Sequence, residues 1–395
     1  MGEVAEFYNG DRGPNYPKPS EIVEQGVPFI NAGDLINGHI DYHNCKHITS
    51  DKFNQLNGAK LKINDIVYCL RGTIGKNGLV NSDANATIAS SLVCIRPVKL
   101  RPLFLFQILN SSIEERQRKM VDEGAAQPNI SATNLKKFLI PVPNDNEQEK
   151  IGEVFSKLNH LITLQQRKLE QLKQLKTAML QQLFVNKNYK QPILRFKNFN
   201  GNWEKRKFSE LATIRRGLTY KPKDMRDSGK NSKRVLRSSN INENNFVIYN
   251  DDVFVDKCSI NIAYVHNNDI LITAANGSSK LVGKHALIHD IPDNSAVHGG
   301  FMLLASSNNP EFINALMSAP WYSRFVNNYV IGGNGAIGNL KKDDLDSQII
   351  YTPAKNEIKK IGHFFNRLDN LIALQQNKLT QLTTLKEYLL QKLFI

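Results

Sequence analysis

The sequence is poor in cysteine and has no long apolar run. Its four cysteines, Cys45, Cys69, Cys94 and Cys258, stand far apart with no CxxC spacing. This argues against a disulfide framework and a structural zinc site, and favours reduced, buried thiols. The longest apolar stretches, such as 103–109, fall far short of the roughly 20 residues that a bilayer span needs, and the N-terminal residues show no secretory pattern. We therefore expect a cytoplasmic protein.

Motifs for catalysis and for nucleotide binding are also missing. The string GTIGK at 72–76 lacks the GxxxxGK[ST] spacing of a P-loop, and the glycines of 332–335 indicate a flexible turn instead of a phosphate cradle. The sequence contains no Asn-Pro-Pro-Tyr-like string for methyl transfer to adenine and no pattern of paired carboxylates with lysine typical of nucleases. We therefore expect a chain without catalytic chemistry of its own.

Two groups of histidines are candidates for metal ligands. Polar loops that contain histidine are commoner than metal clusters with such spacings, so we expect no metal site. The candidates are His39, His43, Cys45 and His47 in one group, and His285 and His289 in the other.

The positive charge is large and concentrated. The chain has 51 Lys and Arg against 37 Asp and Glu, a formal net charge of +14, which indicates a polyanionic partner, most often nucleic acid. Residues 205–237 alone carry 12 basic and 3 acidic groups, whereas 1–145 carry 16 and 15, and 238–395 carry 13 and 14. This concentration favours a phosphate-binding surface over the alternative of a solvated face, which would mix in more acidic groups.

One block of the sequence occurs twice. Residues 139–185 and 349–395 align without a gap at an offset of 210, and 24 of the 47 aligned positions are identical. In each copy a proline is followed three residues later by asparagine and then by a stretch free of proline, which predicts one helix of about 40 residues, or ~60 Å. The length of 395 residues, at roughly 100 to 200 residues per domain, suggests two or three domains.

Each predicted helix has a heptad seam. Apolar residues recur at alternating steps of four and three, and both copies interrupt the seam with polar residues at the same two places, which fix the register of a coiled coil at a cost in stability. A stripe of ~60 Å is longer than a small domain is wide. This favours packing of the helices on each other over the alternative that each covers its own domain. The seam contains Ile151, Phe155, Leu158, Ile162, Gln165, Leu169 and Leu172, and Ile361, Phe365, Leu368, Ile372, Gln375, Leu379 and Leu382.

The helices divide the chain into two globular segments, 1–140 and 190–348. Both contain short runs rich in Ile, Val and Tyr followed by glycine-containing loops, as at 65–76 and 269–280, which predict mixed domains. The expected fold class is mixed α/β, with two pseudo-symmetric α/β domains separated by two long helices that form an antiparallel coiled coil. Antiparallel helices would relate the domains by a pseudo-dyad, as in bipartite DNA sites, whereas parallel helices would put both domains at one end.

Four strings of the first repeated block carry a resemblance to a known family. They are NEQEKI at 146–151, LNHLI at 158–162, LEQLK at 169–173 and LQQLF at 180–184. With the alternation of variable segment and repeated helix, the whole chain resembles the specificity (S) subunit of type I restriction-modification systems. The motifs are strong in the helices and weak elsewhere, because target recognition domains vary with the sequence they read. The implied domains are target recognition domain 1 at 1–140, spacer helix 1 at 141–187, target recognition domain 2 at 188–348 with an N-terminal arm at 191–207, and spacer helix 2 at 349–395.

The resemblance implies a non-catalytic DNA-recognition subunit. Each target recognition domain would read one half of a bipartite site in double-stranded DNA, and the helices would set the spacer and dock methyltransferase (M) subunits, expected to be two. Restriction/translocase (R) subunits complete the implied complex. The chain itself would bind no cofactor, since S-adenosylmethionine, ATP and Mg²⁺ are implied for the partner subunits. The alternatives are a coiled-coil adaptor whose basic stretch is incidental, and a self-sufficient nuclease.

One departure from the family pattern concerns the first domain. The arm at 191–207 leads into the string FSELA at 208–212, whereas the chain starts with MGEVA, which aligns with that string. The first arm is missing. We therefore expect either that the start codon is misplaced or that domain 1 lacks a strand-like lead-in and exposes an edge.

Contacts to DNA are predicted from composition. In 205–237, basic groups are interleaved with glycine, serine and tyrosine, which suits loops that track a phosphate backbone. Base reading needs Arg on guanine, Asn or Gln on adenine, or an apolar contact with the thymine methyl group. A surface Lys or a turn Asn also occurs without any function. The candidates are Arg12, Lys18, Arg71, Lys76, Asn77 and Gln127 in domain 1, and Arg215, Arg216, Tyr220, Lys221, Lys223, Arg226, Lys230, Lys233, Arg234, Arg237, Asn276, Lys280, Lys284 and Asn334 in domain 2.

Overall fold

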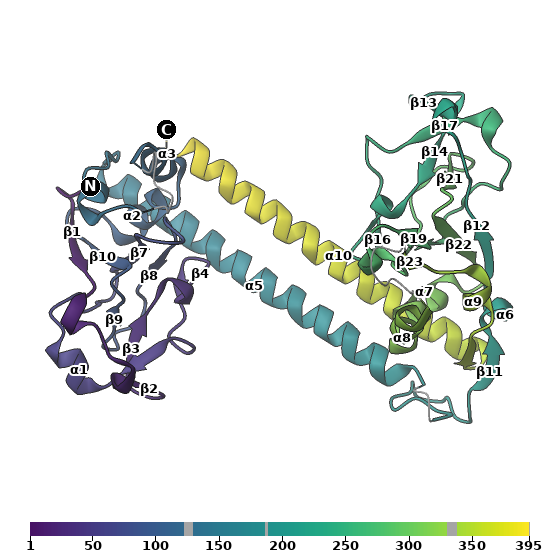
Figure 1. The fold of residues 1–395 in the computed structure, drawn as a ribbon, viewed down its shortest axis with the longest axis horizontal. Coiled ribbons are helices and arrows are strands. Elements are labelled where there is room, and N and C mark those ends of the chain that lie inside the picture. The colour runs from purple at the N-terminus through teal and green to yellow at the C-terminus, as the bar shows by residue number, and fades with distance from the viewer. Residues whose placement is uncertain (122–128, 186–188, 330–337, 395) are drawn as a thin grey trace. The chain divides into compact units, whose positions relative to one another are not determined.

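The structure is a computed structural model that describes residues 1–121, 129–185, 189–329 and 338–394. The chain divides into two compact units. Unit 1 comprises Met1–Arg167 with Asn377–Ile395, and unit 2 comprises Lys168–Gln376. Each unit therefore contains one globular segment and one end of each long helix (Figure 1). Within the described ranges, no helix combines the length and the apolar character needed to cross a membrane.

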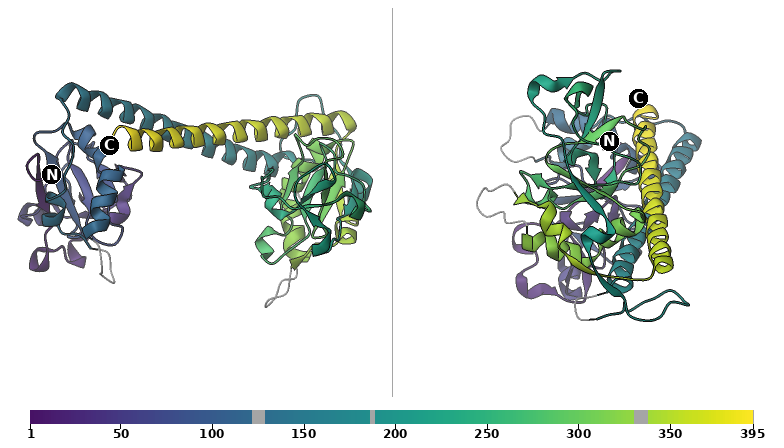
Figure 2. Two further views of the ribbon diagram at one scale, coloured as in Figure 1. Left: turned by 90° about the horizontal axis from the view of Figure 1, so that it is seen from above. Right: turned by 90° about the vertical axis from the view of Figure 1, so that its right-hand side faces the viewer.

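Two long helices are shared by the units. Helix α5 covers Asp145–Leu183, 39 residues, and helix α10 covers Lys355–Lys392, 38 residues. Each runs without a break (Figure 2). The prediction of one helix of about 40 residues in each repeat is confirmed.

Within each unit the two helices pack antiparallel. In unit 1 the start of α5 meets the end of α10, because Phe155 and Phe394 share one core and their ring centroids are 6.0 Å apart. In unit 2 the end of α5 meets the start of α10, where the rings of Phe184 and Phe365 stack 5.8 Å apart. The predicted antiparallel pairing is confirmed by these contacts.

The seam accommodates its lysines in two different ways. All the seam residues predicted from the heptads are buried or half-buried. Lys176 interrupts the seam in unit 2, and its Nζ lies 2.5 Å from Asp369 Oδ1 of α10. The aligned lysine of the second repeat, Lys386, has Asn159 where the alignment would place that aspartate. Burial lowers the pKa of Lys386, so the charge of this lysine is less well accommodated than that of Lys176.

Among the residues that the structure describes, the globular part of unit 1 contains two four-stranded sheets and four short α-helices. The strands of the sheets are β1 (Ala5–Asn9), β2 (Ile22–Val23), β3 (Val27–Ile30), β6 (Lys46–Ile48), β7 (Ile66–Cys69), β8 (Asn77–Leu79), β9 (Thr87–Ile88) and β10 (Leu92–Pro97), with β4 (Leu35–Ile36) and β5 (His39–Ile40) forming a separate ribbon. The helices are α1 (Ser50–Gln55), α2 (Pro102–Ile108), α3 (Ser112–Val121) and α4 (Ala132–Lys136). The antiparallel first sheet has the order β1-β10-β7-β8, and the second has the order β2-β6-β3-β9, in which β3 and β9 are parallel.

Unit 2 repeats this topology. Its strands are β11 (Glu204–Lys207), β12 (Thr213–Arg216), β13 (Met225–Arg226), β14 (Ser232–Leu236), β15 (Ile241–Asn242), β16 (Asn245–Phe246), β17 (Phe254–Asp256), β18 (Ile270–Thr273), β19 (Ala275–Asn276), β20 (His285–Leu287), β21 (Ala296–His298), β22 (Met302–Ser306), β23 (Gly338–Asn339) and β24 (Ile349–Thr352). Its short helices are α6 (Phe208–Leu211), α7 (Pro310–Ser318), α8 (Pro320–Tyr329) and α9 (Lys342–Asp346). The sheets β12-β22-β18-β20 and β13-β17-β14-β21 match those of unit 1 in order, and β14 pairs parallel with β21. The predicted mixed α/β fold with two pseudo-symmetric domains is confirmed.

The units differ at the strand pair formed by β11 and β24, which are antiparallel in unit 2. The residues aligned with β24 in unit 1 are 139–142, which lie in no strand and leave Leu139 81% exposed. The Gln117 side chain takes over part of the pairing. It accepts a hydrogen bond from Leu139 N–H at 2.7 Å and donates one to the Leu139 carbonyl at 2.8 Å. A glutamine side chain thus pairs with two backbone groups of this segment, whose counterpart in unit 2 pairs with β11.

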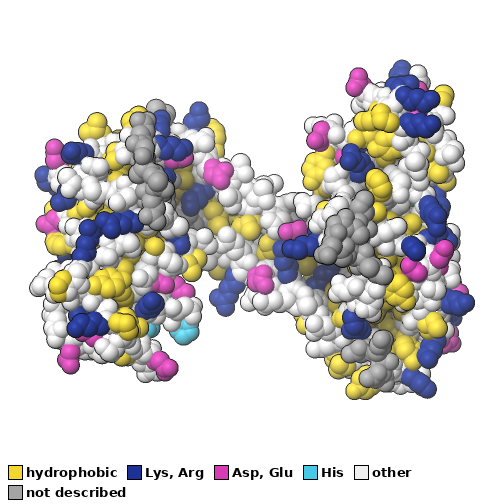
Figure 3. All heavy atoms as spheres, viewed as in Figure 1, with side chains coloured by type: hydrophobic (Ala, Val, Ile, Leu, Met, Phe, Trp, Pro, Cys, Tyr) yellow, Lys and Arg dark blue, Asp and Glu magenta, His cyan; other side chains and the backbone are white. Residues whose placement is uncertain are grey.

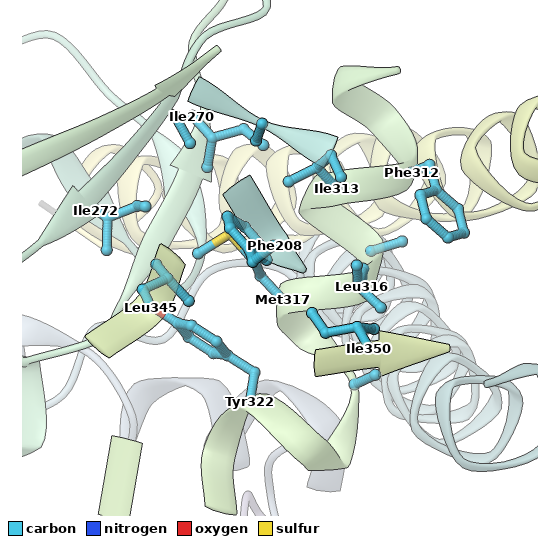
Figure 4. Close-up of a cluster of buried hydrophobic side chains, with 14 of the residues drawn as sticks. Phe208, Ile270, Ile272, Phe312, Ile313, Leu316, Met317, Tyr322, Leu345 and Ile350 are labelled. Atoms are coloured by element: carbon cyan, nitrogen blue, oxygen red, sulfur yellow. The ribbon is translucent and has the colours of Figure 1, made fainter. Parts of the chain in front are cut away.

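The main core of unit 2 lies between the sheet that contains β18, the short helices and the ends of the long helices. Phe208, Ile272, Met317 and Leu345 belong to this core and come from different elements (Figure 4). Burial of such side chains stabilises the fold by ~25 cal/mol per Å² of apolar surface. In unit 1 the corresponding core includes Phe104 of α2. The short helices therefore dock the sheets onto the long helices.

The glycine repeated near the start of both long helices has a packing reason. A Cβ at Gly362 would stand 2.8 Å from the backbone nitrogen of Phe312 in α7, and a Cβ at Gly152 would stand 2.9 Å from Cβ of Leu103 in α2. Both distances are shorter than real Cβ contacts. Glycine therefore lets a short helix approach each long helix closely, which explains why both repeats contain the string KIG.

The four cysteines carry free thiols. Cys45, Cys69 and Cys94 are buried as expected, whereas Cys258 is exposed. Cys258 follows β17 in a single 3-10 turn at the surface, where its N–H donates to Asp256 Oδ1 at 2.9 Å. The expectation of buried thiols is therefore wrong for Cys258.

Replacing Gly362 by Ala tests the close contact between α10 and α7. Helix propensity alone would stabilise the protein by about 1 kcal/mol. Overpacking against the Phe312 backbone instead predicts a net decrease in the free energy of unfolding of about 1 to 2 kcal/mol, measured by urea denaturation. Gly229→Ala is the matched control in unit 2, because nothing lies within 4 Å of its Cβ position. An increase in stability for Gly362→Ala would contradict the packing argument.

Candidate nucleic-acid interface

The basic stretch 205–237 contributes edge strands and one interior strand to the sheets of unit 2. It contains most of β11 and all of α6, β12, β13 and β14 with their connecting loops. Strands β11, β12 and β13 lie at the ends of their sheets, and their side chains are exposed or half-buried except for Ile214 of β12, which is buried. Lys and Arg side chains gather at the end of unit 2 where β13 and β17 lie (Figures 1 and 3). Part of the basic stretch therefore lies at the surface of unit 2.

Two arginines of the stretch are engaged in internal ion pairs. Arg215 Nη2 lies 3.2 Å from Oδ2 of the buried Asp269. Arg234 pairs with Asp252, whose side chain is 4% exposed, and donates to the Tyr249 carbonyl at 2.8 Å. Removing either arginine would leave a carboxylate buried without its counter-ion. Both arginines thus stabilise unit 2, a role that composition did not predict.

Arg226 and Lys233 have weaker intramolecular contacts. Arg226 Nη1 donates to the Lys223 carbonyl at 2.7 Å, and Arg226 Nη2 lies 3.2 Å from Asp256 Oδ2. The backbone N–H of Cys258, together with the positive charge of Arg226, lowers the pKa of Asp256. The Lys233 ammonium group lies 5.8 Å from the ring centroid of Tyr264. Half of the Arg226 side chain remains exposed, so it still faces solvent.

The remaining basic residues between 216 and 237 are exposed. Arg216 approaches Asp343 at 3.9 Å, but both side chains are more than 70% exposed, and such surface pairs contribute little. These side chains are therefore accessible to a polyanion. They are Arg216, Lys221, Lys223, Lys230 and Arg237.

A cavity of about 570 Å³ opens beside the exposed basic residues. We call it the reading cavity. It lies between the loop that follows β12, the start of the loop after β14, and the turn that joins β21 to β22. Three residues predicted from the sequence, Tyr220, Arg237 and Asn276, line it together with Met225 and Phe301. The structure thus brings these three residues together, although they span 57 positions of the sequence.

Lys280 and Lys284 lie apart from the reading cavity. Lys280 is exposed in the turn after β19. Lys284 lines a second cavity of about 570 Å³ with Lys173 and Asp369 of the long helices. The neighbouring His285 is buried, and burial lowers its pKa to about 4, so its ring is neutral at physiological pH.

The candidates of domain 1 lie in different environments. Arg12 and Lys18 are exposed, and Arg12 Nη2 lies 3.4 Å from the Ser90 carbonyl. Arg71 is exposed in the loop after β7, whereas Lys76 Nζ donates to the Ala32 carbonyl at 3.0 Å. The exposed candidate residues of domain 1 therefore lie on separate segments, whereas three candidates of unit 2 line one cavity.

Asn77 has a structural role that contradicts its assignment as a DNA contact. Its side chain is 3% exposed, and Nδ2 donates to the carbonyls of Gly75 at 2.9 Å and Leu109 at 3.2 Å. The amide thus joins β8 to the end of α2 and cannot reach a ligand. Gln127, Asn334 and the glycines of 332–335 lie outside the residues that the structure describes.

Sequence reasoning missed Phe301. The side chain lies in the reading cavity and is 70% exposed. The available signal was a large aromatic residue directly after Gly299 and Gly300. Paired glycines indicate a turn, and a side chain that follows a turn is often exposed.

The histidine groups show no metal-binding geometry. In the part of the chain that the structure describes, no three His, Cys, Asp or Glu side chains are placed to hold a metal ion. His39 and His43 are exposed, and Cys45 is buried with its thiol donating to the Tyr42 carbonyl at 3.4 Å.

Sequence comparison matches the chain to the family described as the type I restriction modification DNA specificity domain, over residues 1–174 and 200–384. The EcoKI specificity subunit of Escherichia coli K12 is 24% identical over 97% of this chain and 85% of that relative. The MjaVIII specificity subunit of Methanocaldococcus jannaschii is 27% identical over 51% of this chain and 46% of that relative.

Two solved structures share the fold. The S subunit of a type I restriction-modification system from M. genitalium superposes with a TM-score of 0.67 at 18% identity, covering 100% of this chain and 94% of that one. A chain from a structure of type I R-M complex assembly superposes with a TM-score of 0.53 at 14% identity, covering 100% and 96%.

Replacing Arg216, Lys221 and Arg237 together by Ala tests the exposed basic surface. Each phosphate contact that is lost lowers the slope of log K against log salt by about one. We expect weaker duplex binding with a flatter salt dependence, measured by fluorescence anisotropy, and an unchanged unfolding midpoint. An unchanged slope would show that this surface faces away from the duplex.

Two controls separate binding from folding. Replacement of Lys359, Arg367 and Lys378, which are exposed on α10 outside the stretch, removes the same charge and should leave the slope unchanged. Arg234→Ala should instead lower the free energy of unfolding by about 3 kcal/mol, because it leaves Asp252 unpaired.

Proposed function

This chain belongs to the family of type I restriction-modification DNA specificity domains, and we propose that its two globular domains each read one half of a bipartite DNA target. The observation that carries the proposal is the duplication of the domain. Two sheets with the same strand orders occur in each unit, and each domain packs on the ends of the same two helices. Two equivalent readers fit a target made of two half-sites. Catalysis belongs to other subunits of such enzymes.

The proposed domain assignment follows the repeat. Target recognition domain 1 comprises residues 1–140 and target recognition domain 2 comprises 188–348, with the arm at 191–207. The arm is anchored to α10, because Arg195 donates from Nε and Nη2 to the two carboxylate oxygens of the buried Glu357, both at 2.8 Å. This bidentate pair ties the arm to the start of spacer helix 2, within the same unit as domain 2.

Most binding free energy in this proposal comes from phosphate contacts. The exposed lysines and arginines around the reading cavity supply them in domain 2, and Arg12, Lys18 and Arg71 supply them in domain 1. Such contacts position the protein without reading the sequence. Discrimination then depends on a few base contacts, each wrong base pair costing roughly 1 to 3 kcal/mol.

The helices set the distance between the half-sites in this proposal. A coiled coil held by a heptad seam is stiff along its axis, and removal of one heptad shortens it by ~10 Å without turning the seam away. The seam pairs such as Lys176 with Asp369 keep the two helices in register. Spacer length in the target should therefore depend on helix length.

The outer faces of the helices support docking of two methyltransferase subunits. Three leucines exposed in the first repeat have exposed leucines at the aligned positions of the second, although leucine in water gains nothing for folding. The duplicated pattern provides two equivalent apolar surfaces for two copies of one partner. The aligned pairs are Leu161 with Leu371, Leu164 with Leu374, and Leu175 with Leu385, all at least 44% exposed.

The complete enzyme requires chemistry from those partners. Methyltransferase subunits would supply S-adenosylmethionine and methylate adenine, and restriction/translocase subunits would supply ATP-driven and Mg²⁺-dependent cleavage. This chain would contribute recognition and geometry alone. The proposal places it in defence against foreign DNA, as part of a complex on double-stranded DNA.

Deleting one heptad from each helix, residues 165–171 and 375–381, tests the spacer role. The complex should methylate the same half-sites with a spacer shorter by about three base pairs, or lose activity if the new rotation between half-sites is not tolerated. Genome-wide mapping of methylated adenines measures both. A control deletion of four residues from α5 alone breaks the seam and should abolish activity. Methylation at the original spacing by the heptad variant would disprove the spacer role.

Replacing Leu161 and Leu164 by Lys tests the docking surface. Because both side chains are exposed, the variant should keep its unfolding midpoint but bind the methyltransferase subunit at least tenfold more weakly, measured by isothermal titration calorimetry. Gln166→Lys adds a charge to an exposed position nearby and serves as control. Unchanged affinity would place the docking surface elsewhere.

A further inference from the structure

Phe301 is an exposed aromatic side chain in unit 2. It follows Gly299 and Gly300 in the turn that joins β21 to β22, and it is 70% exposed. An exposed phenylalanine contributes little to folding, because its apolar surface stays in contact with water. A single exposed apolar residue is ordinary on a protein surface, so its meaning depends on how it is held and on its neighbours.

The backbone around Phe301 is held by hydrogen bonds. The Phe301 carbonyl accepts from the N–H of Ala274 at 2.9 Å and from the N–H of Ala275 at 3.0 Å. Met302 N–H donates to the Gly299 carbonyl at 2.8 Å, which closes the turn. The ring is therefore presented on a firmly positioned backbone, as a contact residue for rigid recognition requires.

The neighbours of Phe301 are residues suited to base recognition. In the reading cavity, Arg237 and Asn276 stand beside Phe301. Asn276 is fixed in place, since its Nδ2 donates to Ser238 Oγ at 3.0 Å and its Oδ1 accepts from Ser278 N–H at 2.9 Å. An arginine next to an exposed ring matches two kinds of base contact, guanine with arginine and the thymine methyl group with an apolar side chain.

The fold itself does not require an aromatic residue at this position. In unit 1 the same turn is closed by Leu92 N–H, which donates to the Ala89 carbonyl at 3.0 Å, and the carbonyl that accepts from Leu70 N–H belongs to Ser91. Ser91 therefore occupies the place of Phe301. Because an equal turn forms with serine, the aromatic ring is a property of the surface of domain 2.

We infer that Phe301 is a specificity-determining residue of target recognition domain 2, which recognises a thymine in its half-site by contact with the 5-methyl group. This inference rests on the proposed function and deepens it. A phenyl ring has no hydrogen-bonding group for phosphate, so its contact is with a base. Arg237, whose Cγ would lie 3.9 Å from a Cβ built at Gly299, lines the same cavity and binds the neighbouring base or phosphate.

Substitution of deoxyuridine for thymidine tests the inference, since it removes only the methyl group. The duplexes carry the target sequence that mapping of methylated adenines identifies, with deoxyuridine in place of one thymidine at a time in either half-site. The affinity of each duplex for the complex of this chain and its methyltransferase subunit is measured by titration. One thymine in one half-site should show a loss of affinity of roughly fourfold, as expected for one buried methyl group. Phe301→Ala should bind the thymidine duplex more weakly and show no further loss at that position.

A second variant distinguishes methyl contact from stacking. Phe301→Leu keeps an apolar contact but has no ring, so it should retain most of the preference for thymidine over deoxyuridine. A different result would overturn the inference: Phe301→Leu loses binding to every duplex of the series, and the wild type binds the deoxyuridine and thymidine duplexes equally. The ring would then act by stacking between bases and not by contact with a methyl group. Tyr249→Ala, which removes an exposed aromatic side chain outside the reading cavity, is the control and should behave as wild type.

The outcomes separate this inference from the proposed function. If the wild-type complex methylates no bipartite target, the proposed function itself fails. If it methylates such a target and Phe301→Ala keeps both its affinity and its deoxyuridine sensitivity, only the assignment of Phe301 is overturned.

Discussion

The packing of helix ends into the cores is the contact on which both units depend. Phe184 ends the first repeat inside the core of unit 2, against Phe365, and Phe394 ends the second repeat inside the core of unit 1, against Phe155. An aromatic side chain buries roughly 150 to 250 Å² and dominates the stability of a small core. Each globular domain is therefore completed by the end of a helix that starts in the other unit.

This arrangement separates the parts of the chain that must stay alike from those that are free to differ. The helices carry the seam and the glycines that admit α2 and α7, and these recur in both repeats. Equivalent positions in the two domains carry different residues. Asn77 of β8 and His285 of β20 both bond to a backbone carbonyl of a short helix or its end, one with an amide and the other with an imidazole ring. Ser91 and Phe301 differ in the same way at the surface. A common scaffold thus carries two unlike surfaces.

The sequence was sufficient for the helices because their signals are local. Heptad spacing and the repeat predicted their extent and pairing. The site was harder, because burial and ion pairing depend on residues far apart in sequence. Arg215 meets Asp269, and Asn77 meets the carbonyl of Leu109, only in the folded chain. No composition rule distinguishes these residues from Arg216 or Arg237, which remain exposed.

The place of Phe394 has a consequence for biosynthesis. Domain 1 leaves the ribosome before domain 2, yet the Phe394 ring that packs in its core lies about 250 residues beyond the end of the domain at residue 140. At ~5 to 20 residues per second, the nascent domain waits for roughly ten seconds or more with an open apolar hollow. Domain 2 does not wait for the corresponding ring of its core, because Phe184 is translated before domain 2. Chaperone binding during translation should therefore concentrate on the N-terminal half of the chain.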